Sequence, residues 1–452
     1  MEDPTIKEFV KQVQAKEIDI LEHTHKVLEK AKKIDKNYNY FTTISEELAL
    51  EQAKEIKKIP KGKLAGLPIT IKDSICVKNV PSHAGSKILD PYIPPFNATA
   101  VEKAIKEGAI IIGKTTQDEF GLGTFAVNTS KIPKNPFDRE RTSGGSSGGC
   151  AGFTQLADFP HLSIAESTGG SIAVPASFCG VAGLTPTYGL VSRYGLIDYA
   201  SSLDKIGTMS QDPEDAFFLL DIIKGYDEKE STSLNTEESK NTEVKKIAFI
   251  EETIDINKDF TRLIDKKVDN YEVVSIPSIK KYALPAYHII AFSEASTNLA
   301  KYTGLRYGAS DKLEGYYHEY FTKVRSKFFE KETKRRIILG TFARMAGFRE
   351  DYYIKAMKVR TLIINEYQRA LKKYDILISP TTITTALKLT EIEKLTPLQH
   401  YLMDLLTVAP NLAGLPHISI NIGSINQLPV GMIATANHLG ENKLKKFVEL
   451  IK

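Results

Sequence analysis

The chain has 452 residues, 42% of them hydrophobic, and a formal net charge of only +4. This length allows two or three ordinary domains or one large α/β unit, and the small charge excludes any general need for nucleic acid or an anionic membrane as partner. Three scattered cysteines without a Cys-x-x-Cys pair argue against a disulfide framework or a zinc site. The acidic start, MEDP, does not resemble a signal peptide, and no apolar run is long enough for a membrane helix, so we expect a cytoplasmic protein with no membrane contact.

Residues 1–62 are expected to form a helical cap on the rest of the chain. From Thr5 to Ile34, apolar residues recur at helical spacing between charged ones. A further helix is predicted from Ser45 to Ile59, because Pro60 follows it directly.

From Leu64 the sequence alternates between strand and helix patterns. We expect a strand over 69–77, a helix over 99–107 and a short buried strand over 109–112 that Gly113 closes. The run GAIIIGKT, which contains this strand, also matches the phosphate-loop pattern G-x-x-x-x-G-K-[ST]. A working phosphate loop curls around its ligand, whereas Ala-Ile-Ile-Ile favours a buried strand. We therefore interpret the match as coincidental and expect no ATP on this chain.

Two glycine-flanked serines dominate the next stretch: Ser146 in the run SGGSSGG and Ser171 in the run ESTGGSI. Glycine lets the backbone adopt positive φ and lets amide groups approach a ligand closely. The amides of Thr168, Gly169 and Gly170 could therefore point at an oxyanion that develops beside Ser171. This arrangement favours acyl-transfer chemistry.

A serine hydroxyl needs a neighbouring base before it becomes a useful nucleophile. Lys72 is the candidate base, because it ends the apolar run 66–71 and burial disfavours the charged form of an amine. Ser146 could relay a proton between Lys72 and Ser171.

Three other interpretations of these motifs stay open. The glycine-rich run could be a flexible linker, although the apolar segment 174–184 that follows is unusual for one. Lys72 could be an ordinary lysine at a strand end that reaches for water. Ser146 also fits the nucleophile-elbow pattern G-x-S-x-G of Ser-His-Asp hydrolases, but a polar loop stands where that pattern needs an apolar strand.

The second half of the chain is expected to complete an α/β sheet around a mostly helical part, residues 280–373. Helices are predicted over 213–223, 286–302, 316–339 and 349–373, and strands over 247–250, 271–276, 374–379, 418–420 and 428–431. The polar, charge-dense stretch 227–246 is predicted to be an exposed loop.

Four stretches of the sequence together resemble the amidase signature family. They are the glycine–serine run, the segment GGSI with its following PASFCG, the lysine in IKD, and later blocks such as SSLDKIG. The resemblance implies one α/β domain over 1–452, with a mixed central sheet flanked by helices on both faces. It also implies that Ser171 is the nucleophile, Ser146 the cis-serine and Lys72 the base.

Within the family, the later blocks are most similar to glutaminase subunits of tRNA-dependent amidotransferases. Holding glutamine requires an arginine for its α-carboxylate and an acid for its α-ammonium. The resemblance assigns these tasks to Arg336 and Asp404, assisted by Tyr287, with Arg335 as a rival for Arg336.

The same resemblance implies that this chain has no cofactor of its own. ATP and Mg²⁺ would lie on a partner subunit, subunits B and C would be partners, and Glu-tRNA(Gln) would be reached mainly through the partner. Members usually carry an aspartate and an arginine where this chain has Ser167, next to Glu166, and Ala173. The alternative hypotheses are therefore a stand-alone amidase and a catalytically weakened scaffold within the complex.

Overall fold

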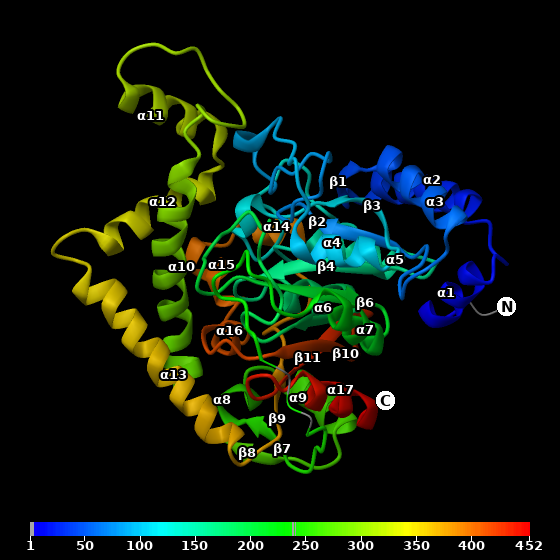
Figure 1. Ribbon diagram of the computed structural model, residues 1–452. Coiled ribbons are helices and arrows are strands. Elements are labelled where there is room, and N and C mark those ends of the chain that lie inside the picture. Colours follow the sequence, from blue (N-terminus) through cyan, green and yellow to red (C-terminus); the bar gives the residue numbers. More distant parts are fainter. Residues whose placement is uncertain (1–3, 237–238, 240) are drawn as a thin grey trace.

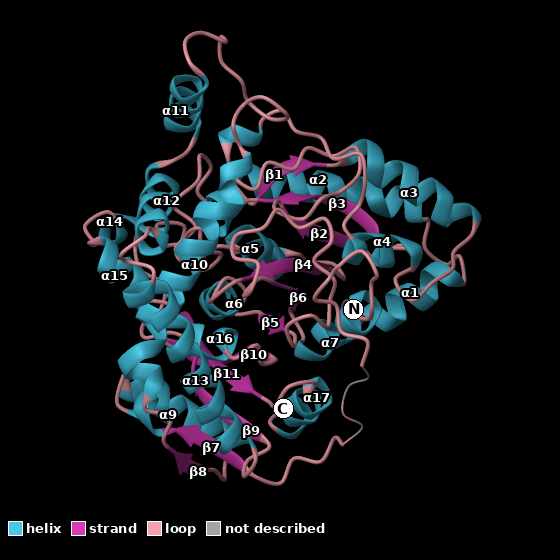
Figure 2. Cartoon of the chain, turned by 60° about the vertical axis from the view of Figure 1, so that its left-hand side comes forward, coloured by secondary structure: helices cyan, strands magenta, loops and turns pink. Residues whose placement is uncertain are grey.

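A single mixed sheet of 11 strands runs through the molecule, and Figure 2 shows it from β1 at the top to β8 at the bottom. The computed structural model describes residues 4–236, 239 and 241–452. In spatial order the strands are β1 (Phe41–Ile44), β3 (Ile110–Thr115), β2 (Pro68–Lys72), β4 (Leu162–Ser167), β6 (Lys205–Ser210), β5 (Ala182–Thr185), β10 (His417–Ile425), β11 (Leu428–Thr435), β9 (Ile376–Pro380), β7 (Ile247–Ile250) and β8 (Glu272–Val274). Parallel and antiparallel pairs both occur, which confirms the predicted mixed sheet.

One face of the sheet is covered by helices from the two ends of the chain and from its middle. They are α1 (Ile6–Gln14), α2 (Ile20–Tyr38), α3 (Glu46–Lys58), α4 (Thr99–Lys106), α7 (Pro213–Ile223) and α17 (Glu441–Leu450). Their apolar residues join those of the strands in one core, which explains the helical spacing of the N-terminal sequence. Local sequence sets the ends of these helices: Thr5 and Glu8 form a capping box for α1, and Asp212 caps α7 just before Pro213.

The other face carries two short helices that contain no charged residue and then an outer helical layer. The first are α5 (Gly148–Leu156) and α6 (Ala173–Cys179), which pack with Ile172, Val181 and Met209 into a small core of their own. The outer layer contains α10 (Leu284–Asn298), α11 (Tyr317–Phe328), α12 (Lys331–Arg344) and α13 (Lys355–Leu371), which Figure 1 shows in yellow and green on the left. Shorter helices are α8 (Glu251–Ile254), α9 (Lys258–Lys267), α14 (Leu389–Ile392), α15 (Pro397–Leu402) and α16 (Val408–Leu412). No described helix is long and apolar enough to cross a membrane.

Among the predicted elements that differ from the structure, three differ for reasons that can be seen in the contacts. The strand expected over 69–77 ends at Lys72, because the chain turns there and the Ile75 amide donates back to the Lys72 carbonyl. The strand expected to close at Gly113 continues to Thr115, since both neighbouring strands pair with it there. The single helix expected over 316–339 is two helices, α11 and α12, which the extended residues Phe329 and Glu330 separate.

The stretch 227–246 was expected to be an exposed loop, and its described residues form neither helix nor strand. Residues 237, 238 and 240 of that stretch lie outside the described part. Within it, Asp227 and Glu230 are anchored, since Ser192 Oγ donates to Asp227 at 2.6 Å and Arg193 pairs with Glu230 at 2.9 Å.

Candidate active site

Lys72 lies at the carboxyl end of β2, completely buried in the centre of the sheet. Its ammonium group donates to three acceptors: Ser146 Oγ at 2.7 Å, Glu166 Oε2 at 2.8 Å and the Glu166 carbonyl at 3.0 Å. Three N–H donors and three acceptors leave no hydrogen of the ammonium unpaired. The side chain therefore does not reach for water, and the interpretation as an ordinary strand-end lysine does not hold.

Ser146 and Ser171 come together although they lie on different segments. The peptide bond between Gly145 and Ser146 is cis, and α5 begins two residues later. The Ser147 amide donates to the Ser171 carbonyl at 3.2 Å, which brings the two backbones into contact. Lys72 and Ser146 are fully buried, whereas Ser171 retains 6% of its surface, so of these three only Ser171 can meet a substrate from outside.

The loop between β4 and α6 carries the three residues predicted to hold an oxyanion, Thr168, Gly169 and Gly170. No hydrogen bond among the described residues is donated by their backbone amides, so these donors are available to a ligand. The loop is clamped through its other groups, since the Asn411 side chain donates to the Gly169 carbonyl and the Val174 amide to the Gly170 carbonyl.

Tyr287 and Asp404, both predicted to bind substrate, lie directly against this loop. A Cβ placed on Gly169 would come within 2.6 Å of the Tyr287 hydroxyl, and one on Gly170 within 3.0 Å of Asp404 Oδ1. The second oxygen of Asp404 accepts from the Thr124 hydroxyl at 2.9 Å. Burial, assisted by the charge of Asp118, raises the pKa of Asp404 to about 7, although Thr124 and Arg336 oppose this shift.

Arg336 is the more buried of the two candidate arginines. Its side chain is 5% exposed, against 33% for Arg335, and both residues bond to Glu332. The guanidinium of Arg336 also donates from Nη1 to the Tyr199 hydroxyl at 3.1 Å and lies 5.4 Å from the ring centroid of Tyr401. Among the described residues, Nη2 of Arg336 makes no hydrogen bond, which leaves it available for a carboxylate.

A cavity of about 350 Å³ lies beside the two arginines. Both arginines line it, together with Asp118, Leu122, Gly123, Thr124, Phe125, Val127, Asn128, Lys331, Glu332, Leu395, Pro397, His400 and Tyr401. Asp118 accepts from the amides of Ala126 and Asn128, and burial raises its pKa to about 6. The structure thus brings every predicted site residue into one region, around the ends of β2 and β4.

The structure explains both the phosphate-loop match and the nucleophile-elbow match. Lys114 of the phosphate-loop match lies within β3, fully buried, and donates to Ser82 Oγ at 2.6 Å, so the segment is a strand and not a loop. Ser146 of the nucleophile-elbow match bonds to Lys72, and no described histidine bonds to Ser146 or Ser171. The described residues also hold no group of three or more His, Cys, Asp or Glu side chains suited to a metal.

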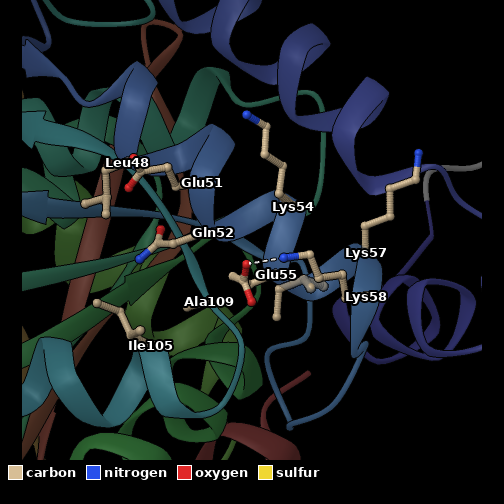
Figure 3. A pocket seen from close by; sticks show the side chains of 10 residues that line it. Leu48, Glu51, Gln52, Lys54, Glu55, Lys57, Lys58, Ile105 and Ala109 are labelled. Atoms are coloured by element: carbon tan, nitrogen blue, oxygen red, sulfur yellow. Dashed lines mark hydrogen bonds and ion pairs between the residues drawn. The ribbon is translucent and has the colours of Figure 1, made fainter.

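A larger hollow, of about 830 Å³, lies beside α3 and contains none of the predicted site residues. Figure 3 shows that apolar side chains such as Leu48 and Ile105 and several charged side chains line it together. Glu55 and Lys58 pair there at 2.7 Å. Its lining contains no serine, threonine, cysteine or histidine, so size alone does not identify the active site here.

Comparison with known proteins agrees with this geometry. The model of the Amidase family matches residues 22–444. The chain belongs to the amidase family. The catalytic roles of Lys72, Ser146 and Ser171 stay predictions from the motif resemblance.

Curated amidase relatives match nearly the whole chain. The A subunit of the glutamyl-tRNA(Gln) amidotransferase of Archaeoglobus fulgidus is 46% identical over 433 residues, which cover 93% of each protein. The protein of the same name from Methanosarcina mazei is 45% identical and covers 94% of this chain and 91% of its own.

Solved structures of amidases share the fold. The crystal structure of the A subunit of the glutamyl-tRNA(Gln) amidotransferase from Thermotoga maritima is 33% identical, covers 98% of this chain and 93% of its own, and has a TM-score of 0.79. The peptide amidase of Stenotrophomonas maltophilia, at 23% identity, has a TM-score of 0.80 over 98% of this chain and 95% of its own, and this likeness extends to the fold alone.

Several residues of the site were not found from the sequence. In the sequence, Glu166 stands out only as the neighbour of the unusual Ser167, yet its carboxylate forms an ion pair with Lys72. Asp204 lies within the SSLDKIG block, where the sequence suggests no role for it. Its Oδ1 lies 2.7 Å from the Thr168 hydroxyl. Tyr199 and Tyr401 gave no signal at all, because an aromatic residue that frames an arginine looks in sequence like any other core residue.

Proposed function

We propose that this chain is the glutaminase subunit of a glutamyl-tRNA(Gln) amidotransferase. The observation that carries the proposal is the 2.7 Å bond from the buried Lys72 amine to Ser146 Oγ, next to the glycine loop that bears Ser171. The names of the relatives that match most of the chain support glutamine as the amide and tRNA-bound glutamate as its eventual acceptor.

In the acylation step, Ser171 Oγ attacks the side-chain amide carbon of glutamine. The serine proton passes to Ser146, and Ser146 gives its own proton to neutral Lys72. The negative charge that develops on the amide oxygen is stabilised by the backbone amides of Thr168, Gly169 and Gly170. The carbon–nitrogen bond then breaks, the nitrogen takes the relayed proton and leaves as ammonia, and a glutamyl ester remains on Ser171.

In the deacylation step, the same groups act in reverse order on water. Water gives a proton to the serine–lysine relay and attacks the ester carbon, and Ser171 leaves with that proton restored. Glutamate is released. Each turnover therefore yields one ammonia and one glutamate, with no net change in the protonation of Lys72.

Selectivity for glutamine over simple amides comes from charges placed away from the reacting carbon. Arg336 Nη2 binds the α-carboxylate, and Asp404 binds the α-ammonium. Tyr287, packed on Gly169, assists at the reacting end. Glu332 and Tyr199 hold the guanidinium of Arg336 in place, at 2.8 and 3.1 Å, so little side-chain freedom is lost on binding.

The ammonia is used elsewhere in a complex. Subunits B and C are the partners, ATP and Mg²⁺ are bound by the partner subunit, and Glu-tRNA(Gln) meets this chain mainly through that partner. The proposal includes a cytoplasmic location, which the three buried, unpaired cysteines support, since a reducing compartment leaves such thiols free.

The Ser171→Ala variant, purified together with the partner subunits, tests whether Ser171 is the nucleophile. We expect ammonia release from glutamine to fall to background while the complex still forms and still uses free ammonia. Mass spectrometry of the intact wild-type chain after trapping with a glutamine analogue should show a covalent adduct that the variant lacks. Unchanged ammonia release by the variant would exclude the catalytic assignment, and full activity of the lone chain on simple amides would favour a stand-alone amidase.

A further inference from the structure

The carboxylate of Glu166 lies on the far side of Lys72 from the serines. Its Oε2 is 2.8 Å from Nζ, and both side chains are almost completely buried, at 0% and 4% exposure. The ion pair that this contact forms contains the ammonium form of the lysine. The relay needs the opposite, a neutral amine with a free lone pair that faces Ser146. The pair in the resting structure therefore has to change its protonation before the first proton moves.

The Thr168 hydroxyl connects Glu166 to a second carboxyl group, that of Asp204. The Thr168 hydroxyl is 2.9 Å from Glu166 Oε1 and 2.7 Å from Asp204 Oδ1. A hydroxyl has one hydrogen and can donate to only one of the two oxygens. The other contact is a hydrogen bond only when one of the two carboxyl groups carries a proton.

Asp204 is the group that holds this proton. It is fully buried, and burial, together with the charge of Glu166, raises its pKa well above the ordinary value. Its Oδ2 accepts from the amides of Tyr199 and Ala200, and its Oδ1, which also lies 3.1 Å from the Ala200 amide, faces the Thr168 hydroxyl at 2.7 Å. The described contacts then form one continuous chain: Asp204, Thr168, Glu166, Lys72 and Ser146.

We propose that Glu166 is a positioning residue that controls the protonation of Lys72. It takes the proton that Lys72 must release before the relay can run, and Thr168 and Asp204 supply the hydrogen bond that keeps its other oxygen satisfied. The proton moves from Nζ to Oε2 of Glu166 along the 2.8 Å contact, which leaves a neutral amine and a neutral acid, and rotation about the Cε–Nζ bond then turns the amine lone pair toward Ser146. No charge leaves the buried site, so this transfer needs no external acceptor.

Other ionisable groups around the pair are few. The charge of Lys72 acts to lower the pKa of Asp118 and of the Cys150 thiol. The charge of Arg193 acts to lower the pKa of Asp204. Arg336 acts on Asp118 and lies in the substrate cavity. None of these four makes a hydrogen bond to Lys72 or Glu166 among the described residues, so Glu166 is the group in position to exchange a proton with the amine.

The test is the dependence of kcat/KM on pH for glutamine hydrolysis, measured on the complex, and it rests on the function proposed above. Glu166→Gln removes the charge and keeps the shape. We expect the midpoint of the ascending limb to move to higher pH by about 1 unit or more, because Lys72 of the variant has no acceptor in the site and must lose its proton to solvent before the relay can run. Glu166→Asp, which retains the carboxylate, is expected to keep the midpoint near that of the wild type even when its rate is lower.

A purely structural role for Glu166 predicts a different result, namely a lower rate with an unmoved midpoint, and that result overturns the inference. Glu166→Met provides the same removal of charge if the glutamine variant does not fold, and the same shift is expected. Ser171→Ala separates the two levels of the argument. Loss of activity in Ser171→Ala with an unmoved midpoint in Glu166→Gln rejects only the role of Glu166, whereas retained activity in Ser171→Ala rejects the proposed function itself.

Discussion

Two buried lysines occupy neighbouring strands of this sheet, and their immediate surroundings are nearly the same. Lys72 of β2 lies 2.7 Å from a serine hydroxyl and 2.8 Å from a carboxylate, and Lys114 of β3 lies 2.6 Å from the Ser82 hydroxyl and 3.6 Å from Asp73. Both side chains are fully buried. Contact between a buried lysine and a serine is therefore not sufficient to define a catalytic site.

The difference lies on the two faces of the sheet. Lys72 is paired with Thr115 in the parallel register and Lys114 with Ile71, so the two lysines point to opposite faces. Lys72 points to the face that carries α5, α6 and the glycine loop, where a second serine and free amides lie beyond the first hydroxyl. Besides Ser82, Lys114 contacts the carbonyl and the carboxylate of Asp73, and these contacts have a structural role.

Replacing each lysine with methionine should separate chemistry from structure most clearly. Lys72→Met removes the base of the relay, and we expect kcat for glutamine hydrolysis to fall on the order of 10³-fold or more. Lys114→Met leaves the relay intact, so its kcat at a temperature where it is folded should stay close to that of the wild type. Ammonia release under saturating glutamine measures both. A comparable loss in the two variants would remove the distinction between the faces.

The two serines give the next largest contrast. Ser146→Ala interrupts proton transfer between Ser171 and Lys72, and such a loss costs roughly 10² to 10⁴-fold in rate. Ser82→Ala removes only a buried hydrogen bond, worth about 1 kcal/mol of stability, and kcat should be almost unchanged. The same assay combined with thermal unfolding distinguishes these results, and a catalytic defect in Ser82→Ala would contradict the structural role of the Lys114 pair.

Stability should show the opposite pattern. Lys114→Met leaves the Asp73 carboxylate buried without its cation, and breaking a buried pair in this way costs about 3–5 kcal/mol. Asp73→Asn in the same chain removes the stranded charge and should restore most of the loss. Urea unfolding of the single and double variants measures the difference. Equal stability of Lys114→Met and the double variant would mean that Asp73 is not charged in the fold.

The sequence was sufficient to predict what depends on local pattern. The capped helix α7 has the predicted bounds, because Asp212 and Pro213 determine where it starts. The glycine-rich motifs likewise predicted that Ser146 and Ser171 share one site, and the structure brings their two segments into contact. The apolar run 66–71 also predicted correctly that Lys72 is buried.

What the sequence did not provide depends on contacts between distant segments. The break at Glu330 arises because its amide donates to Glu119, more than 200 residues earlier, at 2.9 Å. Lys72 and Lys114 could not be ranked by burial, since only the register of β2 against β3 decides which face each one meets. The role of Glu166 likewise follows from its 2.8 Å approach to Lys72, which no spacing in the chain encodes.

Asp404 is a buried carboxyl group of the proposed glutamine site. Because it titrates, KM should depend on pH through Asp404 and not through the Lys114–Ser82 contact. Its pKa of about 7 is raised mainly by burial, so the charged form that binds the α-ammonium of glutamine is lost as pH falls through 7. Taking that value, we expect KM to be about 10-fold higher at pH 6 than at pH 8, because the charged fraction falls by that factor. Steady-state kinetics of the wild type, of Asp404→Asn and of Ser82→Ala measure this. Asp404→Asn should have a raised KM at pH 8 with little dependence on pH, whereas Ser82→Ala should follow the wild type. A KM that is flat in the wild type would exclude Asp404 as the partner of the ammonium.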